Sequence, residues 1–95
     1  MGSIFSKIGR GLRESGDYAR AMEVKNTNPE SAVDILAPYA TAANPRACIA
    51  LGKIYEQIGE DEKAYQEYRK VAIRNKEART RGARLARELG IVYEN

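Results

Sequence analysis

Histidine is absent from this 95-residue sequence, and cysteine occurs once, at Cys48. Without histidine, most zinc sites, every Ser-His-Asp or Cys-His arrangement and the usual general base are excluded. A single cysteine cannot form an internal disulfide, and such sparse use is typical of a reducing compartment, the cytoplasm. A chain of this length holds one domain or a few units of a repeat. The sequence therefore predicts a protein that is not an enzyme and uses no metal or cofactor.

Long apolar runs are also missing, so no segment is predicted to cross a membrane. The net charge of +3 conceals an uneven distribution along the chain. Residues 69–87 contain eight basic residues and one acidic residue, a net charge of +7, whereas the rest has eight basic and twelve acidic residues, a net charge of −4. Such asymmetry indicates an acidic partner surface.

Glycine and proline divide the chain into segments whose apolar residues recur at helical, not alternating, spacing. Asn28-Pro29 and Asn44-Pro45 each place an N-cap residue before a proline suited to the first turn, so helices are predicted to begin at both sites. Pro38 is expected to kink or interrupt the first of these helices, because it removes a backbone donor.

The N-terminal segment carries one helical stripe, which is predicted to end near Gly16. Asp17 is placed to cap a second helix, and Gly59 and Gly90 are predicted to end two later helices. The stripe consists of Ile4, Phe5, Ile8 and Leu12. The sequence as a whole predicts an all-α fold of about five to six helices with short connections and antiparallel neighbours.

Small and large residues recur at fixed spacing, which indicates an internal repeat. The central copy consists of Cys48, Leu51, Gly52, Tyr55, Gly59, Ala64 and Tyr68. An N-terminal copy precedes it by 43 residues and consists of Phe5, Ile8, Gly9, Leu12, Gly16 and Ala21. A fainter copy follows 34 residues after the central one and consists of Gly82, Leu85, Ala86 and Leu89. Gly9 and Gly52 occupy the same position of the repeat and allow a second helix to approach closely, and the small side chain of Ala64 is expected to face Gly52.

The pattern Leu51-Gly52-x2-Tyr55, followed by Ala64-x3-Tyr68, resembles the tetratricopeptide repeat. The resemblance is best over residues 45–78, with departures at three positions. In the N-terminal copy, Lys25 stands where an aromatic residue is usual. In the central copy, Val71 stands where alanine is usual and Lys76 where the closing proline is usual. The resemblance implies an α-solenoid, a short array of antiparallel helical hairpins.

The sequence therefore predicts a single domain over residues 1–95, which consists of five parts. They are an N-terminal unit or arm (1–28), an intervening helix (29–44), the best-matched repeat (45–78), a partial or capping helix (79–90) and a tail (91–95). The helix in 29–44 either intervenes between the N-terminal unit and the best-matched repeat or pairs with the second predicted helix, which would leave the first helix as a separate arm.

The resemblance also implies a protein-interaction module or adaptor, a small subunit of a larger assembly that binds protein segments in a groove lined by the first helix of each unit. In such modules the residue after the close-contact glycine tends to face the groove. The corresponding residues and their basic neighbours are Arg10, Lys53, Arg87, Lys7, Arg46 and Arg84. A basic stripe of this kind would hold an acidic peptide through charge-assisted hydrogen bonds. The alternative is that these residues form the solvated faces of amphipathic helices.

Three other functions remain open. Gly2, with Ser6 and Lys7, fits an N-myristoylation signal and would make the protein peripheral to a membrane, although Met-Gly-Ser is also a common cloning remnant. The chain is also suited to a structural part of a virus-like or multi-subunit particle that uses the same surfaces. For the adaptor, the uncapped ends of the array predict self-association or a partner that covers them. The 69–87 basic run suggests nucleic-acid binding, but aromatic residues for base stacking are lacking there.

Among the remaining polar and reactive side chains, packing roles are expected. Tyr55 and Tyr68 are expected in the core, because aromatic residues at helical spacing usually pack there, whereas Tyr65 is open between the core and a ligand-stacking surface. Cys48 occupies a packing position without a partner base, so it is predicted to be a buried, unreactive thiol.

Overall fold

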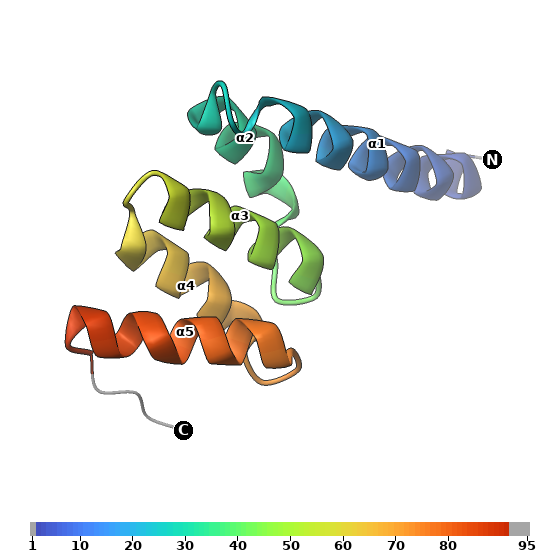
Figure 1. The fold of residues 1–95 in the computed structure, drawn as a ribbon. Helices are drawn as coiled ribbons and strands as arrows, with labels where there is room; N and C mark the ends of the chain where they lie inside the picture. The colour runs from blue at the N-terminus through green and yellow to red at the C-terminus, as the bar shows by residue number, and fades with distance from the viewer. Residues whose placement is uncertain (1, 92–95) are drawn as a thin grey trace.

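The computed structural model describes the backbone of residues 2–91 and the side chains of residues 13–91. This part is all-helical and contains no strand, as predicted (Figure 1). Its elements are α1 (Gly2–Val24), α2 (Pro29–Leu36), the short 3-10 helix η1 (Ala37–Tyr39), α3 (Pro45–Gln57), α4 (Asp61–Val71) and α5 (Lys76–Leu89).

Asparagine side chains start three of the helices. The Asn28 side chain accepts a hydrogen bond from the backbone N–H of Ser31 at 3.2 Å, and Asn44 accepts one from Ala47 at 3.2 Å. Each asparagine is followed by proline in the first turn, so both predicted starts are confirmed. Asn75 caps α5 in the same way without a proline, through the N–H of Ala78 at 3.0 Å.

The predicted helix ends at Gly59 and Gly90 are also confirmed. Both glycines adopt a left-handed backbone, with φ of +80° and +74° respectively. Glycine is favoured there because it has no Cβ to clash. Pro38 lies in η1, and α2 ends two residues before it, at Leu36.

The predictions that Gly16 ends a first helix and that Asp17 caps a second one are both wrong. The chain continues as one helix of 23 residues from Gly2 to Val24. Glycine inside a helix costs only about 1 kcal/mol relative to alanine and does not by itself force a turn. Beyond Gly16 the helix is held by its own packing, since Ala21 is buried and Tyr18 packs against the core.

Each helix packs chiefly against its neighbours along the chain. α1 packs on α2, α2 on α3, α3 on α4 and α4 on α5, with a smaller contact between α3 and α5. The helix that follows Asn28 therefore pairs with the second half of α1. Figure 1 shows the first half of α1 extending beyond the end of α2 as an arm. Its stripe Ile4, Phe5, Ile8 and Leu12 lies outside the side chains that the structure describes.

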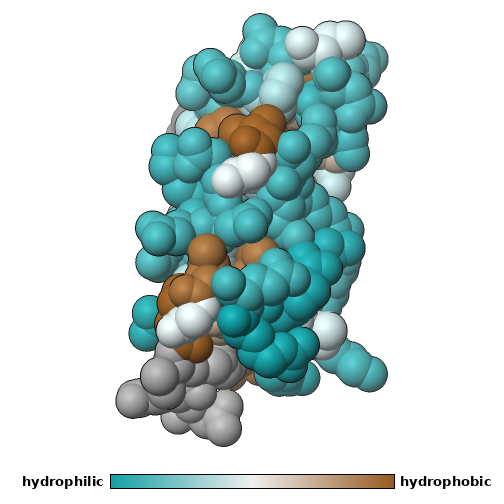
Figure 2. Space-filling model, turned by 60° about the vertical axis from the view of Figure 1, so that its left-hand side comes forward, coloured by the Kyte–Doolittle hydropathy of each residue, from teal (hydrophilic) through white to brown (hydrophobic). Residues whose placement is uncertain are grey.

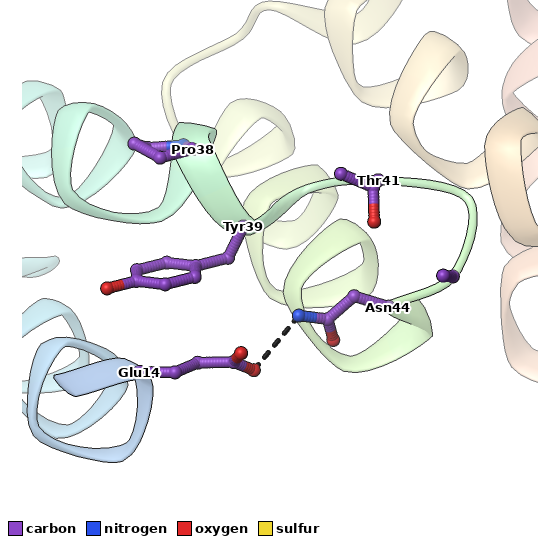
Figure 3. A pocket seen from close by; sticks show the side chains of 6 residues that line it. Glu14, Pro38, Tyr39, Thr41 and Asn44 are labelled. Carbon is purple, nitrogen blue, oxygen red and sulfur yellow. Dashed lines mark hydrogen bonds between the residues drawn. The ribbon is translucent and has the colours of Figure 1, made fainter. Parts of the chain in front are cut away.

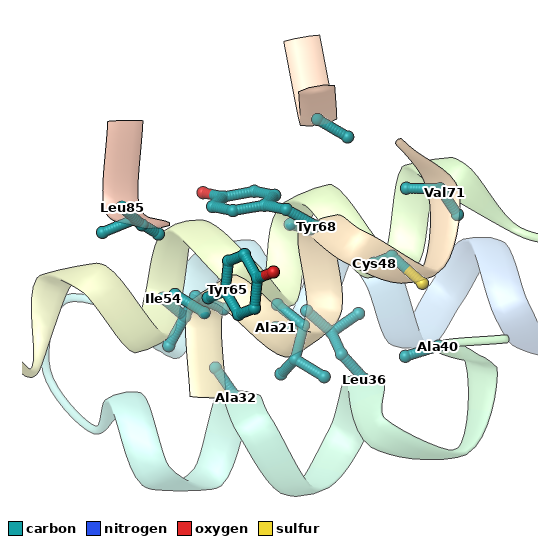
Figure 4. Packing of buried hydrophobic residues seen from close by; sticks show 14 of the residues in the cluster. Ala21, Ala32, Leu36, Ala40, Cys48, Ile54, Tyr65, Tyr68, Val71 and Leu85 are labelled. Carbon is teal, nitrogen blue, oxygen red and sulfur yellow. The ribbon is translucent and has the colours of Figure 1, made fainter. Parts of the chain in front are cut away.

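The core is a continuous band of small and large side chains that runs from α1 to α5 (Figure 4). Alanines bring the helices close together, and a few large residues fill the space between them. The largest fully buried side chains are Tyr68, Leu36, Leu51, Ile54, Leu85, Val71 and Cys48. Much of the face in Figure 2 is hydrophilic, with hydrophobic atoms reaching the surface in separate places.

The side chain that lies closest to Gly52 is that of Tyr68, another residue of the repeat pattern. A Cβ at Gly52 would lie 2.5 Å from Cε1 and 2.7 Å from Cζ of Tyr68, so the aromatic ring occupies the space that glycine leaves open. Ala64, the expected partner, is fully buried one turn earlier on α4. Because Tyr68 follows Ala64 by four residues on the same face, the spacing indicated the correct side of α4.

A part-buried polar cluster joins α4 to the segment after η1. Lys70 Nζ donates to the Ala40 carbonyl at 3.2 Å and to the Glu67 carboxylate at 3.0 and 3.1 Å. Cys48 Sγ donates to the Thr41 carbonyl at 3.3 Å. Two polar contacts therefore hold this connection against α3 and α4.

Candidate protein-binding surfaces

Five charged residues on adjoining sides of α3 and α5 form a charged network. Its members are Lys53, Glu56, Glu77, Arg81 and Arg84. Glu56 is its centre, because its carboxylate pairs with Arg84, lies 3.4 Å from Arg81 Nη1 and accepts a hydrogen bond of 2.5 Å from the Tyr68 hydroxyl. The network thus connects α3, α4 and α5.

Glu77 forms the second half of the network. Its Oε2 lies 2.9 Å from Lys53 Nζ and 3.1 Å from Arg81 Nε. The hydrogen bond from Lys53 is the largest cause of a lowered pKa of Glu77, with Arg81 contributing in the same direction. Burial, followed by the hydrogen bond to Glu56, raises the pKa of Tyr68 far above its ordinary value. At neutral pH the carboxylate is therefore charged and the phenol protonated.

The network contains two of the basic residues that the sequence assigned to a binding groove. Lys53 and Arg84 lie on the same side of the molecule, but each forms an ion pair with an acidic residue of its own chain. Arg84 also reaches Glu88 at 3.7 Å. Because their charges are neutralised within the chain, these two residues add little net positive potential.

The other predicted groove residues lie apart from the network. The Arg46 guanidinium stacks 3.7 Å from the centre of the Tyr18 ring. Arg87 is exposed on α5. Lys7 and Arg10 belong to the first half of α1, and their side chains fall outside the described residues, as do the surroundings of Gly2.

Exposed basic residues also lie along a side of α5 that contains no member of the charged network. This α5 stripe consists of Lys76, Arg79 and Arg87, spaced three and eight residues apart so that they lie on one side of the helix. Among residues 13–91, no carboxylate pairs with any of them, and Arg79 donates only to the Ala72 carbonyl, at 3.5 Å. Arg87 belongs to the predicted groove, whereas Lys76 and Arg79 were predicted only as members of the 69–87 basic run. Helical spacing combined with the absence of acidic residues on that side would have identified them.

A second surface feature is a pocket where α2 meets the turn between α3 and α4. This acidic pocket has a volume of about 270 Å³ and is lined by Glu30, Val33, Asp34, Tyr55, Ile58, Glu60 and Lys63. Val33, Tyr55 and Ile58 supply apolar surface, and three carboxylates surround it. Lys63 is near both Glu60, at 4.0 Å, and the Tyr55 ring, at 5.9 Å. Tyr55, expected in the core, is thus half-buried at a pocket wall, whereas Tyr65 and Tyr68 are buried.

A more open cavity of about 540 Å³ lies between α1 and the segment that leads into α3 (Figure 3). Asn44 Nδ2 donates to Glu14 at 2.9 Å across it, and the Tyr39 hydroxyl donates to Asp17 at 2.5 Å. The bond to Asp17 is the main cause of a raised pKa of Tyr39. These contacts hold α1 against η1 and the start of α3.

The cysteine has the buried position that the sequence predicts. Cys48 is fully buried, and burial raises the pKa of its thiol, with the nearby Glu67 carboxylate acting in the same direction. A thiol is a weaker nucleophile than a thiolate, so this environment suits a packing role.

Within the described part of the chain, no group of three or more cysteine or acidic side chains is placed to hold a metal ion. No helix there is both long and apolar enough to span a bilayer. Neither a known protein family, nor a curated protein, nor a solved structure matches this chain.

Proposed function

We propose that this chain is a non-enzymatic interaction module, a short helical array similar to tetratricopeptide repeats, which binds an acidic segment of a partner protein. The observation that carries the proposal is the α5 stripe, three exposed cations on one side of a helix with no carboxylate among the described side chains to neutralise them. The stripe retains Arg87 from the predicted groove and replaces Lys53 and Arg84, whose charges are paired within the chain.

Electrostatics within α5 favour a ligand for the stripe. Lys76 and Arg79 are neighbours three residues apart, and like charges at that spacing destabilise a helix. Both also lie in or near the first turn, where the helix dipole disfavours positive charge. A carboxylate-rich segment along this side of α5 would relieve both effects and form charge-assisted hydrogen bonds with the guanidinium groups.

The arrangement of α3, α4 and α5 supports the repeat-like part of the proposal. α3 and α4 are joined by a short turn at Gly59, and α5 packs on α4 with its network side toward α3. The glycine and tyrosine of the repeat pattern meet between α3 and α4, where a Cβ at Gly52 would lie 2.5 Å from Cε1 of Tyr68. The packing of α5 in a rigid array fixes the relative positions of the three stripe residues. This reduces the conformational entropy that the protein loses when an extended segment binds.

The test is site-specific photo-crosslinking in a native lysate, with a photoreactive residue at Ala83, inside the stripe, or at exposed Gln66 on α4. We expect Ala83 to capture an acidic protein segment that Gln66 does not capture. The variant K76E/R79E/R87E should lose this product. The control R13E/R20E/K25E, which has the same change of net charge on α1 and the residue that follows it, should keep the product. Equal capture at both positions, or capture that survives the stripe variant, would refute the proposal.

Nucleic acid is the main competing ligand for exposed arginines, since phosphates are also recognised by such side chains. The crosslinking is therefore repeated after nuclease treatment of the lysate. A product that persists is protein bound directly to α5, whereas a product that disappears assigns the stripe to nucleic acid and contradicts the proposal.

A further inference from the structure

The turn between α4 and α5 exposes a large hydrophobic side chain. Ile73 lies in this turn with 95% of its surface accessible. Arg69 and Arg74, close to it in the chain, form no ion pair with the described residues. An apolar side chain flanked by free positive charges suits a hydrophobic recess with an acidic rim.

The acidic pocket has these complementary properties. Its apolar lining comes from Val33, Tyr55 and Ile58, and its volume of about 270 Å³ is sufficient for an aliphatic side chain. Three of its four charged lining residues are acidic, and the one base, Lys63, is near Glu60. Ile58 itself is partly exposed, so part of this apolar lining reaches solvent.

The two features lie at opposite ends of α4. The pocket is lined by residues of the turn from α3 into α4, and Ile73 belongs to the turn from α4 into α5. Figure 1 shows these two turns at opposite ends of α4. The 11 residues of α4 separate them by about 16 Å along the helix axis. Within one chain they are therefore apart, whereas a second copy can bring its Ile73 turn to the pocket.

We propose that this protein associates head to tail with copies of itself, with Ile73 of one copy inserted into the acidic pocket of the next. Arg69 and Arg74 then face the carboxylates of Glu30, Asp34 and Glu60. The hydrophobic contact supplies the main attraction, and the charges direct the encounter and set the orientation. Because the two patches differ, the contact is heterologous, and it propagates as a row or closes into a ring.

This inference goes beyond the proposed function and does not depend on the α5 stripe, since it uses different residues. Sedimentation velocity of the complete chain at increasing concentration tests it. We expect the average mass of the wild type to rise above the 10.6 kDa of one chain. Association should weaken with added salt, because the charged pairs are solvent-exposed and screened.

Two variants remove one patch each. I73D places a charge where the apolar side chain should insert, and E30K/D34K reverses two carboxylates at the pocket. Each should weaken self-association by about tenfold or more, because an apolar contact or several charge pairs are lost. I73L and the charge-matched E23K/E88K should still associate. Helical circular dichroism should be unchanged in all four variants, since the altered side chains are exposed.

Mixing the two defective variants gives the decisive result. I73D retains the pocket and E30K/D34K retains Ile73, so the mixture should form a one-to-one dimer that grows no further. A wild type that stays monomeric at every concentration, association that persists in I73D, or a mixture that forms no dimer would each overturn the inference. A monomeric wild type leaves the crosslinking result on the α5 stripe unaffected. Failure of the self-association proposal can therefore be distinguished from failure of the proposed function.

Discussion

Gly52 shows how much depends on one missing methyl group. Tyr68 occupies the space beside it, has no exposed surface and is held by its hydroxyl on Glu56. The ring therefore cannot move away from an added Cβ without disturbing the charged network. This fixed ring makes Gly52 a stronger packing constraint than the other glycines in the described helices.

We predict that Gly52→Ala lowers the free energy of unfolding by about 2 kcal/mol, because overpacking outweighs the gain in helix propensity. Urea denaturation followed by circular dichroism measures the change. Adding Tyr68→Leu should make the effect of Gly52→Ala much smaller, since the clashing ring is gone. A fully additive double variant would contradict the packing explanation.

Tyr68 also makes the free energy of unfolding depend on pH in the alkaline range. An unfolded tyrosine loses its proton near pH 10, whereas the folded pKa is raised by burial and by the bond to Glu56. Above pH 10 the unfolded state therefore holds fewer protons than the folded state. The free energy of unfolding must fall as pH rises, by about 1.4 kcal/mol per pH unit for this one phenol. Below pH 10 the contribution of the Tyr68 phenol to the free energy of unfolding is fully present.

We expect Tyr68→Phe to reduce this alkaline slope. Urea unfolding of both proteins between about pH 8 and pH 11.5 measures it, in the window set by the raised pKa. Lysines and the other tyrosines contribute a slope common to both proteins. Identical slopes would show that the Tyr68 phenol is not the group responsible.

At the scale of the helix, α1 differs from the other helices in having a glycine in its interior with free space around it. No atom outside its local backbone lies within 4 Å of the position that a Cβ on Gly16 would occupy. The site is exposed and helical, so alanine should fit without strain.

We predict that Gly16→Ala stabilises the protein by about 0.5–1 kcal/mol, through lower backbone entropy in the unfolded chain. Urea unfolding detects the gain. Gly90→Ala serves as the matched comparison, because the left-handed backbone at Gly90 should make the same substitution destabilising. A destabilised Gly16→Ala protein would indicate that α1 bends at this position.

Helix boundaries were predictable wherever the signal is local. Asn28-Pro29 and Gly59 act on backbone groups within one turn, so their neighbours in the sequence suffice to identify them. The prediction at Gly16 failed because α1 continues through this residue, and that continuation depends on the packing of Tyr18 and Ala21 against distant elements.

The same distinction explains the predicted groove. Lys53 and Arg84 were recognisable as basic helical residues, but their carboxylate partners lie 24 and 28 positions away in the chain. Spacing within one helix contains no information on pairs between helices. The free charges of the α5 stripe could have been found, because both the basic residues and the absence of acids on that side are properties of one helix.

The whole molecule is extended and thin, with extents of 51 × 32 × 15 Å. Its helices contact mainly their sequence neighbours, so no single element touches the entire core. In such quasi-linear arrays, stability is a sum of local and nearest-neighbour terms. A destabilising substitution at one end of the array should therefore loosen the helices at that end first.

Leu36 and Leu85 provide a matched test, since both are fully buried leucines but lie near opposite ends of the array. We predict that Leu36→Ala costs about 3 kcal/mol through the cavity it leaves, and that amide hydrogen exchange accelerates first in α1 and α2. Leu85→Ala should cost a similar amount and accelerate exchange first in α5. If amide exchange instead rises equally in all helices of both variants, the chain unfolds as one cooperative unit. The contacts between neighbouring helices would then be strong enough that a cavity at one end destabilises the whole array.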